Sequence, residues 1–389
     1  MTIEEKLKVL QNGALKEIEK KHGEGSYYLG KKVMPHVDVL CSTGSIDLDN
    51  ALTIGGWPKN RLIEISGKES SGKTTMCLIS IAEAQKQGHV CAFVDAEQAF
   101  DKMFAKKLGV NTDDLIILQP DTAEEGFDQI HSIIKSGVVS LIVVDSTNSL
   151  IPKRIFDGEV GDAAMGRAAL LFSQEYPKVR TECTQSGCTA IFISQLRKSM
   201  SPYESDKIGV GEAGKYYFSI RIKTRKAEVQ KDDGEVGQTS VDVILDIFKN
   251  KVGVPFKKAQ FTLLTGQDGL YGIDSIKEII EYGIRFNFIK KAGAWFTIGD
   301  EKFNGMPQVR NYFKEHEDAF ISLKDKVISE LSKYGQEIRE GSFDSTMEQI
   351  IAENEKPSRK RKSKSEDSSI EIKEENVSDG EIVGEESKE

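Results

Sequence analysis

The sequence predicts an α/β protein whose core has a mostly parallel central sheet, with an N-terminal helix and a small C-terminal α/β domain. Two observations carry this prediction. From about residue 61 to 195, short apolar runs alternate with helical segments, which is the pattern of a parallel sheet covered on both faces. Residues 67–74 fit the motif G-x-x-x-x-G-K-[ST], between a predicted strand and a predicted helix at residues 74–87. This context indicates the phosphate-binding loop (P-loop) of an ATPase core.

The predicted strands fall into two groups. The first five are almost continuously apolar, as expected for strands buried on both faces of a parallel sheet; they are residues 61–65, 90–95, 115–118, 141–145 and 189–194. The later three alternate apolar and polar residues, which predicts that the sheet continues with antiparallel strands; they are residues 218–226, 239–248 and 260–264.

Residues 3–20 are predicted to form one amphipathic helix. Its apolar positions are spaced by four, three, four and four residues, with Glu and Lys between them, at Ile3, Leu7, Leu10, Ala14 and Ile18. The glycines within residues 22–25 end the helix. The apolar stripe covers either its own domain or a neighbouring subunit, and periodicity alone leaves both open.

The C-terminal part divides into a small mixed region and a tail. From about residue 274 helical spacing returns, at Ile321, Leu323, Val327, Ile328 and Leu331. Residues 356–364 then hold six basic side chains, and residues 366–389 hold ten acids against two lysines, a composition too charged to fold. We therefore expect four parts: an N-terminal helix and linker, an ATPase core, a small domain and a flexible basic-then-acidic tail, at residues 1–34, 35–272, 273–335 and 336–389.

Composition limits the compartment and the partners. The five cysteines form no C-x-x-C pair, which indicates reduced thiols in a cytoplasm rather than a zinc site or a disulfide framework. We expect neither a signal peptide nor a membrane span, because no apolar run reaches about eighteen residues. The formal net charge of the whole chain is −9. The acidic block contributes −8 and the basic block contributes +6, so residues 1–355 carry a net charge of −7. A DNA-binding surface would therefore be a local patch.

The glycine-rich motif predicts a site for ATP and Mg²⁺. Backbone N–H groups of the loop and of the helix start converge on phosphate oxygens. Lys73 is expected to bridge the β- and γ-phosphates, and Thr74 to offer its hydroxyl to Mg²⁺. Asp145 ends the strand at residues 141–145 and is expected to hold Mg²⁺ through its water shell. The predicted phosphate-loop residues are Gly67, Lys68, Glu69, Ser70, Ser71, Gly72, Lys73 and Thr74.

A base that activates water is expected near the phosphates. Many ATPases of this broad class place a Glu beside the strand-ending Asp, whereas here Ser146 follows Asp145. Glu97 is the best candidate, because it follows the strand after the P-loop helix and the ends of parallel strands gather at one edge of a sheet. We assign it the polarisation of the attacking water. The alternative is a charged loop residue.

Lys249 and Lys251 lie one residue apart at the end of a predicted strand. Both side chains therefore project to the same face. Two ammonium groups on one face repel each other unless an anion lies between them. They are either an anion-binding pair or a solvated surface pair.

These residues and several longer segments resemble the bacterial RecA recombinases. The resemblance runs from about residue 5 to 330, and its most specific segments are residues 42–49, 69–75, 91–97, 119–122, 158–162, 249–251 and 291–295. It implies a RecA-type ATPase that polymerises as a helical filament on single-stranded DNA, pairs it with homologous duplex DNA and exchanges strands in recombination and repair. Some relatives also promote self-cleavage of a repressor, so a LexA-type repressor of an SOS response is an open expectation for a partner.

The resemblance implies roles for further residues around the nucleotide. It assigns Gln195 the sensing of the γ-phosphate, through two hydrogen-bonding arrangements of its amide. It assigns Lys249 and Lys251 the neutralisation of charge on the γ-phosphate held by the adjacent protomer. Phe104 is implied to stack on adenine, and the other implied nucleotide contacts are Thr75 and Asp101.

Two glycine-bearing loops are implied to face DNA. The first is residues 157–166 and the second is roughly residues 196–212, and both suit sequence-neutral binding of single strands. The implied DNA-binding residues are Met165, Gly166, Arg167, Ser173, Arg197, Lys198, Tyr203, Gly209 and Gly211.

The chain departs from the family pattern at several positions. Lys68 replaces a proline of the phosphate loop, and Thr265 replaces an aromatic residue near the base, so we expect a looser adenine pocket. Leu170 and Pro177 stand where the family has DNA-contacting arginines, and the second loop is shorter.

Two other classes stay open on the residues alone. A P-loop kinase that phosphorylates a small molecule should turn over without DNA. A non-enzymatic DNA-binding scaffold should hold ATP only as a structural ligand, and Glu97 and Gln195 argue against it. Measuring ATP hydrolysis with and without single-stranded DNA separates all three classes.

Overall fold

The computed structural model describes residues 1–23, 26–27, 37–156, 164–197, 207–208, 213–230, 240–266 and 270–340. The strands of the large sheet are β3 Leu62–Gly67, β4 Val90–Asp95, β5 Ile116–Leu118, β6 Val139–Asp145, β7 Thr189–Arg197, β8 Lys207–Ile208, β9 Ile220–Gln230, β10 Ser240–Asn250, β11 Lys257–Thr265 and β12 Tyr271–Ile273. The helices of the same part are α3 Ile46–Leu52, α4 Lys73–Lys86, α5 Lys102–Lys107, α6 Ala123–Lys135, α7 Lys153–Phe156, α8 Ala164–Ser186 and the 3-10 helix η2 Ala213–Tyr216.

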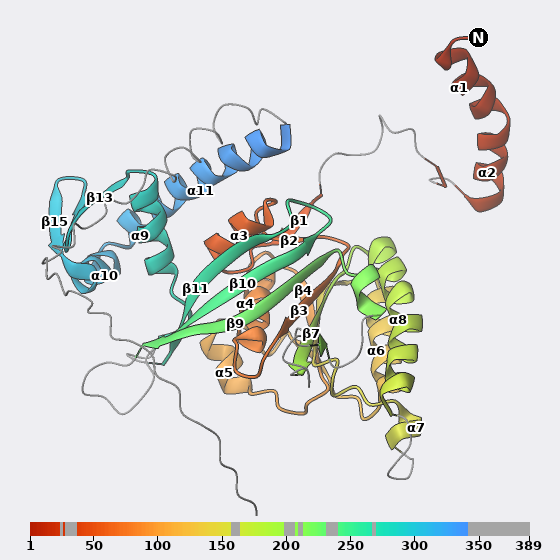
Figure 1. Ribbon diagram of the computed structural model, residues 1–389, viewed down its shortest axis with the longest axis horizontal. Coiled ribbons are helices and arrows are strands. Elements are labelled where there is room, and N and C mark those ends of the chain that lie inside the picture. Colours follow the sequence, from red (N-terminus) through yellow and green to blue (C-terminus); the bar gives the residue numbers. More distant parts are fainter. Residues whose placement is uncertain are drawn as a thin grey trace, which may run out of the picture. The chain divides into compact units, whose positions relative to one another are not determined.

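The large sheet has the strand order β12-β11-β10-β9-β3-β7-β6-β4-β5, with β8 paired to β7 (Figure 1). β3, β7, β6, β4 and β5 are parallel neighbours, which confirms the parallel sheet expected from their apolar sequences. Helices cover both faces. One apolar core packs α4 and α5 against the sheet, and it includes Ile63, Met76 and Ala105. The other packs α6 and α8 against the opposite face, and it includes Phe127 and Phe172.

β9 is the strand at which the sheet changes direction. It pairs in parallel with β3 on one side and antiparallel with β10 on the other, and the β10–β11 and β11–β12 pairs are antiparallel too. The alternating pattern of residues 218–226 therefore predicts the antiparallel neighbour but gives no sign of the parallel one. A parallel pair requires a crossover connection, and the chain between β7 and β9 supplies it.

A smaller α/β part follows β12. It contains α9 Ser275–Arg285, a three-stranded sheet, α10 Gly305–Glu315 and α11 Glu317–Glu340; the three strands are β13 Ile289–Ala292, β14 Trp295–Ile298 and β15 Glu301–Asn304. This part has an apolar core of its own. In α11, Leu323 and Val327 are buried in it, as their helical spacing predicts, whereas Ile321 and Ile328 are exposed.

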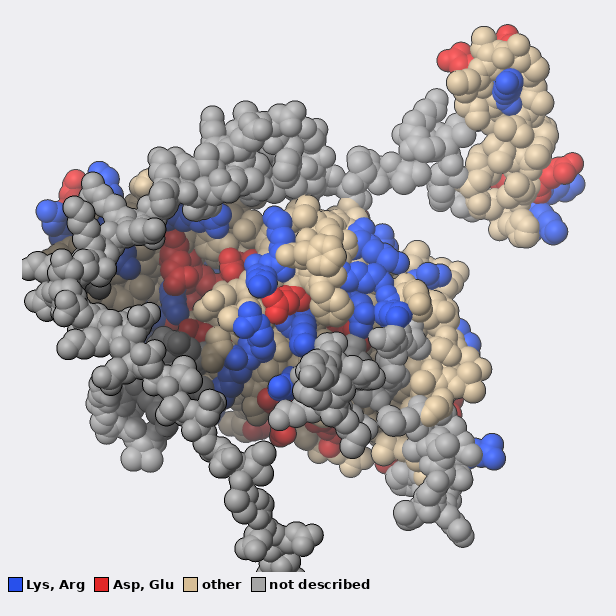
Figure 2. Space-filling view, viewed as in Figure 1, with Lys and Arg blue, Asp and Glu red and all other residues tan. Residues whose placement is uncertain are grey.

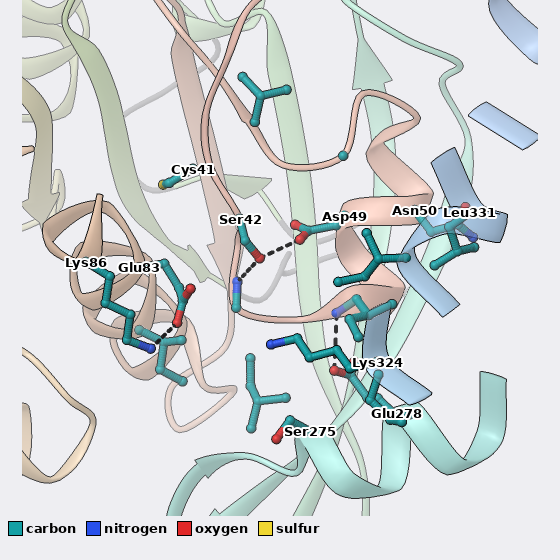
Figure 3. Close-up of a pocket in the computed structure, with 18 of the residues that line it drawn as sticks. Cys41, Ser42, Asp49, Asn50, Glu83, Lys86, Ser275, Glu278, Lys324 and Leu331 are labelled. Atoms are coloured by element: carbon teal, nitrogen blue, oxygen red, sulfur yellow. Dashed lines mark hydrogen bonds and ion pairs between the residues drawn. The ribbon is translucent and has the colours of Figure 1, made fainter. Parts of the chain in front are cut away.

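Hydrogen bonds from α9 attach this smaller part to α3. The Glu278 carboxyl accepts from the Ser45 hydroxyl at 2.5 Å, just before α3. It also accepts from the Ile46 N–H at 3.2 Å, at the start of α3 (Figure 3). Tyr282 donates its hydroxyl to Asp47 at 2.5 Å. Burial raises the pKa of Glu278 to about 8, against the lowering effect of these hydrogen bonds. The two parts are thus joined through a carboxyl whose charge is costly.

A cavity of about 710 Å³ lies beside this contact, lined by residues of α3, α4, α9 and α11. Figure 3 shows Asp49, Glu83 and Lys324 among its polar residues. None of the predicted phosphate-site residues lines it. The predicted phosphate site therefore lies outside this cavity.

The N-terminal segment forms two helices where the periodicity predicts one. α1 spans Ile3–Asn12 and α2 spans Ala14–His22, and Gly13 between them has φ −109° and ψ −106°. Glycine weakens a helix interior because it loses the most backbone freedom on folding. Gly23 ends α2 with a φ of 90°, as predicted. No residue of either helix is buried in the described part of the chain.

Two short strands complete the described elements. β1 Val39–Cys41 and β2 Trp57–Pro58 pair antiparallel on either side of α3 in the sequence. Among all helices that the structure describes, none has the length and apolar character that a bilayer span requires.

Candidate active site

The P-loop has the strand-loop-helix context that its motif requires. β3 ends at Gly67, and α4 begins after Gly72, whose φ of 81° suits a residue without a side chain. A Cβ on Gly67 would lie 2.1 Å from the Thr224 hydroxyl. The Ser71 hydroxyl donates to the Lys68 carbonyl and lies 2.7 Å from the same Thr224 oxygen. β9 therefore braces the loop, a contact that the sequence did not predict.

Lys73 is the first residue of α4 and is only 7% exposed. Its ammonium donates to the Lys68 carbonyl at 2.7 Å, across the loop. Burial lowers the pKa of Lys73, and the carboxylates of Asp145 and Glu97 oppose this effect. A buried ammonium held inside a loop of converging N–H groups suits a polyanion.

Thr74 and Asp145 face each other, as expected for two ligands of one cation. The Thr74 hydroxyl donates to the Asp145 carboxylate at 2.5 Å, from the first turn of α4 to the end of β6. Burial raises the pKa of Asp145 to about 6, opposed by the Thr74 hydrogen bond. No cluster of three metal-ligating side chains occurs among the described residues. One hydroxyl and one carboxylate fit Mg²⁺, which takes its other ligands from phosphate and water.

Glu97 accepts hydrogen bonds from three side chains at the same edge of the sheet. Its Oε1 lies 2.6 Å from the Ser146 hydroxyl, 3.0 Å from the Gln195 amide nitrogen and 3.4 Å from the Ser149 hydroxyl. Glu97 itself is exposed, so its second carboxylate oxygen is accessible to a water molecule. The structure therefore brings together Glu97 and Gln195, which are far apart in the sequence.

Asp95, the other carboxylate at the end of β4, is buried and holds the following loop in place. It is 2% exposed and accepts from the backbone N–H groups of Ala99 and Phe100 and from the Gln119 amide. These three bonds fix the loop after β4, and the 2% exposure keeps this carboxylate away from water. The choice of Glu97 over Asp95 as the base is consistent with this difference.

The sequence analysis missed three polar residues of the cluster. Ser146 and Ser149 bond to Glu97, and the Asn148 side chain accepts from the Gln195 backbone N–H at 2.7 Å. All three belong to the run Ser-Thr-Asn-Ser that follows Asp145. A run of small polar residues directly after a buried strand was the available signal.

The residues implied for adenine are only partly brought together. Asp101 caps α5, and its carboxylate accepts from the N–H groups of Met103 and Phe104 at 2.8 and 3.0 Å. The Phe104 ring lies edge-on to Tyr271, with 6.2 Å between the ring centroids. Tyr271 is the direct cross-strand partner of Thr265. An aromatic side chain therefore stands next to the position where the sequence lacks one.

Lys249 and Lys251 project toward the same element, as their spacing predicts. The Lys249 ammonium donates to the Lys215 carbonyl, and the Lys251 ammonium donates to the Tyr216 carbonyl at 3.3 Å. Both carbonyls belong to η2. Burial lowers the pKa of Lys249 to about 8, and the charges of Lys251 and Arg221 add to this effect. Lys249 is thus a cation whose charge is easily lost.

Four of the nine implied DNA-binding residues lie outside the described residues, namely Lys198, Tyr203, Gly209 and Gly211. The side chains of Met165, Arg167 and Arg197 also lie outside the description. α8 already includes Ala164 and Gly166, and β7 continues to Arg197, which pairs with Lys207 of β8. The regular elements therefore extend into both expected loops. Ser173 lies on α8 and donates its hydroxyl to the Leu170 carbonyl at 2.6 Å.

Comparison with known proteins places these features in one family. The model of the RecA N-terminal domain matches residues 8–270, and that of the RecA C-terminal domain matches residues 277–332. The chain belongs to the RecA family. It is a recombinase of DNA recombination and repair, and its ATPase activity depends on DNA.

Individual RecA proteins match over most of their length. Protein RecA of Rickettsia massiliae is 44% identical over 334 residues, which are 82% of this chain and 92% of that protein. Protein RecA of Teredinibacter turnerae is 42% identical over 357 residues, or 88% of this chain and 97% of that protein. Protein RecA of Paracoccus denitrificans is 41% identical over 328 residues, or 81% and 88%.

Proposed function

We propose that this RecA protein hydrolyses ATP with Mg²⁺ at its P-loop while it is assembled as a helical filament on single-stranded DNA. In that filament it pairs the bound strand with homologous duplex DNA and exchanges strands. The observation that carries the proposal is the cluster in which Glu97 accepts from Gln195 and Ser146, at the strand ends beside the Thr74–Asp145 pair.

Each side chain of this cluster has one task. Lys73 and the loop N–H groups bind the phosphates, and Thr74 and Asp145 hold Mg²⁺, which neutralises charge that develops on the phosphates. Glu97 orients and polarises the attacking water. Gln195 exchanges its hydrogen bond to Glu97 for one to the γ-phosphate, and this change reaches β7, which leads into the second DNA loop.

Lys249 and Lys251 complete the site of a neighbouring subunit. Both ammonium groups end on backbone carbonyls of η2, which are weak partners that a phosphate can replace. Their charges then stabilise the transition state as an arginine finger does. Under this proposal hydrolysis requires assembly, since one chain alone lacks two cations of its own site.

The remaining assignments are proposals of the same kind. Thr75, Asp101 and Phe104 contact the nucleotide, and the two loops at residues 157–166 and 196–212 contact DNA. We assign assembly to residues 1–34 and catalysis to residues 35–272. Residues 273–335 form a small accessory domain, and residues 336–389 form a tail. A cytoplasmic location is supported by five free and buried cysteines. A LexA-type repressor is the proposed protein partner.

Two variants test the chemistry. Lys73→Ala should abolish hydrolysis and leave the melting temperature nearly unchanged, because the ammonium donates its hydrogen bond to a loop carbonyl and not to the apolar core. Glu97→Ala should keep ATP binding and DNA-dependent assembly, while turnover falls by roughly 10²–10⁴-fold because the water loses its base. Nucleotide binding, assembly on single-stranded DNA and hydrolysis are measured for both. If the Glu97 variant fails to bind ATP, Glu97 has a structural role instead.

A further inference from the structure

Glu64 is a carboxylate in the middle of the central sheet that the proposed chemistry does not use. It lies on β3 and is 2% exposed. Its Oε2 accepts from Arg221 Nε at 2.5 Å, and its Oε1 accepts from the Ser194 hydroxyl at 3.3 Å. Burial raises the pKa of Glu64, whereas the guanidinium of Arg221, which cannot lose its proton, favours the carboxylate. A buried ion pair often adds little stability because desolvation is costly. The pair therefore calls for another explanation.

The register of the sheet connects this ion pair to Lys249. Glu64 of β3 is the direct partner of Arg221 of β9, and Arg221 is the direct partner of Lys249 of β10. Directly paired residues carry neighbouring side chains on one face of a sheet. A charged row therefore crosses three strands, with Arg221 between a carboxylate and an ammonium.

The position of Arg221 is fixed on both sides. Its guanidinium lies over the Phe248 ring at 4.8 Å, next to Lys249 in the sequence, while its Nε bonds to Glu64. At the other end of the charged row, Glu64 is connected through Ser194 to Gln195, which bonds to Glu97. Ser194, which bonds to Glu64, directly precedes Gln195 and lies 3.1 Å from the Thr147 hydroxyl.

More positive than negative side chains act on the Lys249 ammonium. Lys251 just after the strand and Arg221 on β9 both repel its ammonium, and the Lys215 carbonyl of η2 accepts its hydrogen bond. Glu64 is the one carboxylate among the groups that shift the pKa of Lys249, and it raises that pKa toward its ordinary value. Without this carboxylate, Arg221 would repel the ammonium with no compensation.

We propose that Glu64 is a positioning residue for Lys249: through Arg221, its buried carboxylate keeps the lysine charged for its action on the phosphate of the neighbouring subunit. The inference rests on the proposed action of Lys249 in a neighbouring site. It adds that the charge of this lysine is favoured by a side chain two strands away, which is buried within the sheet.

The test compares Glu64→Gln with Asp246→Asn in the full-length chain on single-stranded DNA. Asp246 of β10 is the control, because it forms a carboxylate-arginine pair with Arg225 of the same strand β9, but is not among the groups that shift the pKa of Lys249. Figure 2 shows Lys and Arg side chains, with acidic ones among them, over the open face where Figure 1 shows β9, β10 and β11. The control therefore removes a carboxylate from an exposed basic face.

Steady-state ATP hydrolysis is measured from pH 6.5 to 9. For Glu64→Gln we expect the alkaline limb of kcat to move down by about one pH unit, and kcat at pH 8 to fall by up to about fivefold. The KM for ATP should change less than about twofold, because the chain's own P-loop is untouched. Asp246→Asn should match the wild type in all three quantities.

A double variant separates charge from folding. Glu64→Gln leaves Arg221 buried without its partner, which alone can destabilise a fold. Glu64→Gln/Arg221→Gln removes both charges, so the alkaline limb should return to the wild-type position or above it. A purely structural pair predicts instead a lower melting temperature and an unshifted limb in every variant, and that result would overturn the inference.

Lys249→Ala, assayed in the same series, separates this inference from the proposed function. If Lys249→Ala hydrolyses ATP at the wild-type rate, Lys249 has no catalytic role and the proposed function fails at that point. If Lys249→Ala is inactive while Glu64→Gln keeps the wild-type kcat and pH profile, only the inference is wrong. If Glu64→Gln does not fold, Arg221→Gln is measured in its place. Because the charge of Arg221 lowers the pKa of Lys249, the alkaline limb of kcat must then move to higher pH.

Discussion

Lys249 is the residue whose charge the fold controls most directly. Its ammonium is partly buried between η2 and β9, and this burial, with the charges of Lys251 and Arg221, lowers its pKa from 10.5 to about 8. A lysine with a lowered pKa loses its charge as the pH rises through that value. A bound phosphate favours the charged form, so the alkaline limb of hydrolysis should lie at pH 8 or above.

Lys249→Arg tests this control, because arginine keeps its charge at any such pH. We expect the ratio of variant to wild-type kcat to rise with pH, by up to about tenfold for each unit beyond the wild-type midpoint. Lys258→Arg, at an exposed position of β11, controls for the substitution itself. A ratio that stays constant between pH 7 and 9 would show that Lys249 does not set the limb.

At the scale of single residues, the sequence predicted the parts of the site that are local in the chain. The phosphate loop is one continuous motif, so Lys73 and Thr74 could be assigned without knowledge of the fold. Thr224 and Tyr271 could not, because each reaches the site through strand pairing in the second half of the sheet. Glu97 is intermediate, since it required only the rule that parallel strand ends share an edge.

Among the elements, the attachment of α9 to α3 has a clear pH dependence. Glu278 has its pKa raised from 4.5 to about 8 by burial. Between these values the folded chain keeps a proton that the unfolded chain has already lost, so stability falls as the pH rises from 4.5 to 8. Above pH 8 Glu278 is ionised in the folded chain too, so the loss of folding stability has reached its full size.

Glu278→Gln removes this ionisation while keeping a group that can bond to Ser45 and Ile46. The melting temperature of the variant relative to the wild type should therefore rise steadily from pH 5 to 8. The corresponding free energy is at most about 1.4 kcal/mol per pH unit. Glu315→Gln, on the exposed end of α10, is the control and should show no such trend. A relative melting temperature that falls over the same range would contradict the argument.

Elements were predictable where one physical signal dominated. β4 has the predicted bounds, because a continuous apolar run as short as this one is typical of a strand buried on both faces. The N-terminal helix was predicted as one piece because its apolar period runs through Gly13, whereas the backbone breaks there. The parallel pairing of β9 was not predictable, because the alternation of a strand does not say on which side a crossover will place it.

On the scale of the whole molecule, the arrangement of charges points to an assembly. The P-loop lies where β3 meets α4. Lys249 near the end of β10 and Lys251 just after it donate to backbone carbonyls of η2. The stripe of α1 and α2 is likewise exposed, with Ile3 and Leu10 at 77% and 47%. Two cations with weak partners and an uncovered apolar stripe are both expected of a subunit that meets another copy of itself.

Mixing two inactive variants tests whether the active site is shared. Lys73→Ala lacks a working phosphate site but keeps its lysines for a neighbour, and Lys249→Ala/Lys251→Ala keeps the phosphate site but has no lysines to give. On single-stranded DNA, each boundary where the intact P-loop meets intact lysines forms one complete site. Hydrolysis should therefore return in the mixture, at a fraction of the wild-type rate set by the number of such boundaries, and should be greatest near equal amounts of the two variants. Fluorescent labels on each variant establish that mixed filaments form. If they form and the activity never exceeds that of either variant alone, the lysines do not act on a neighbouring subunit.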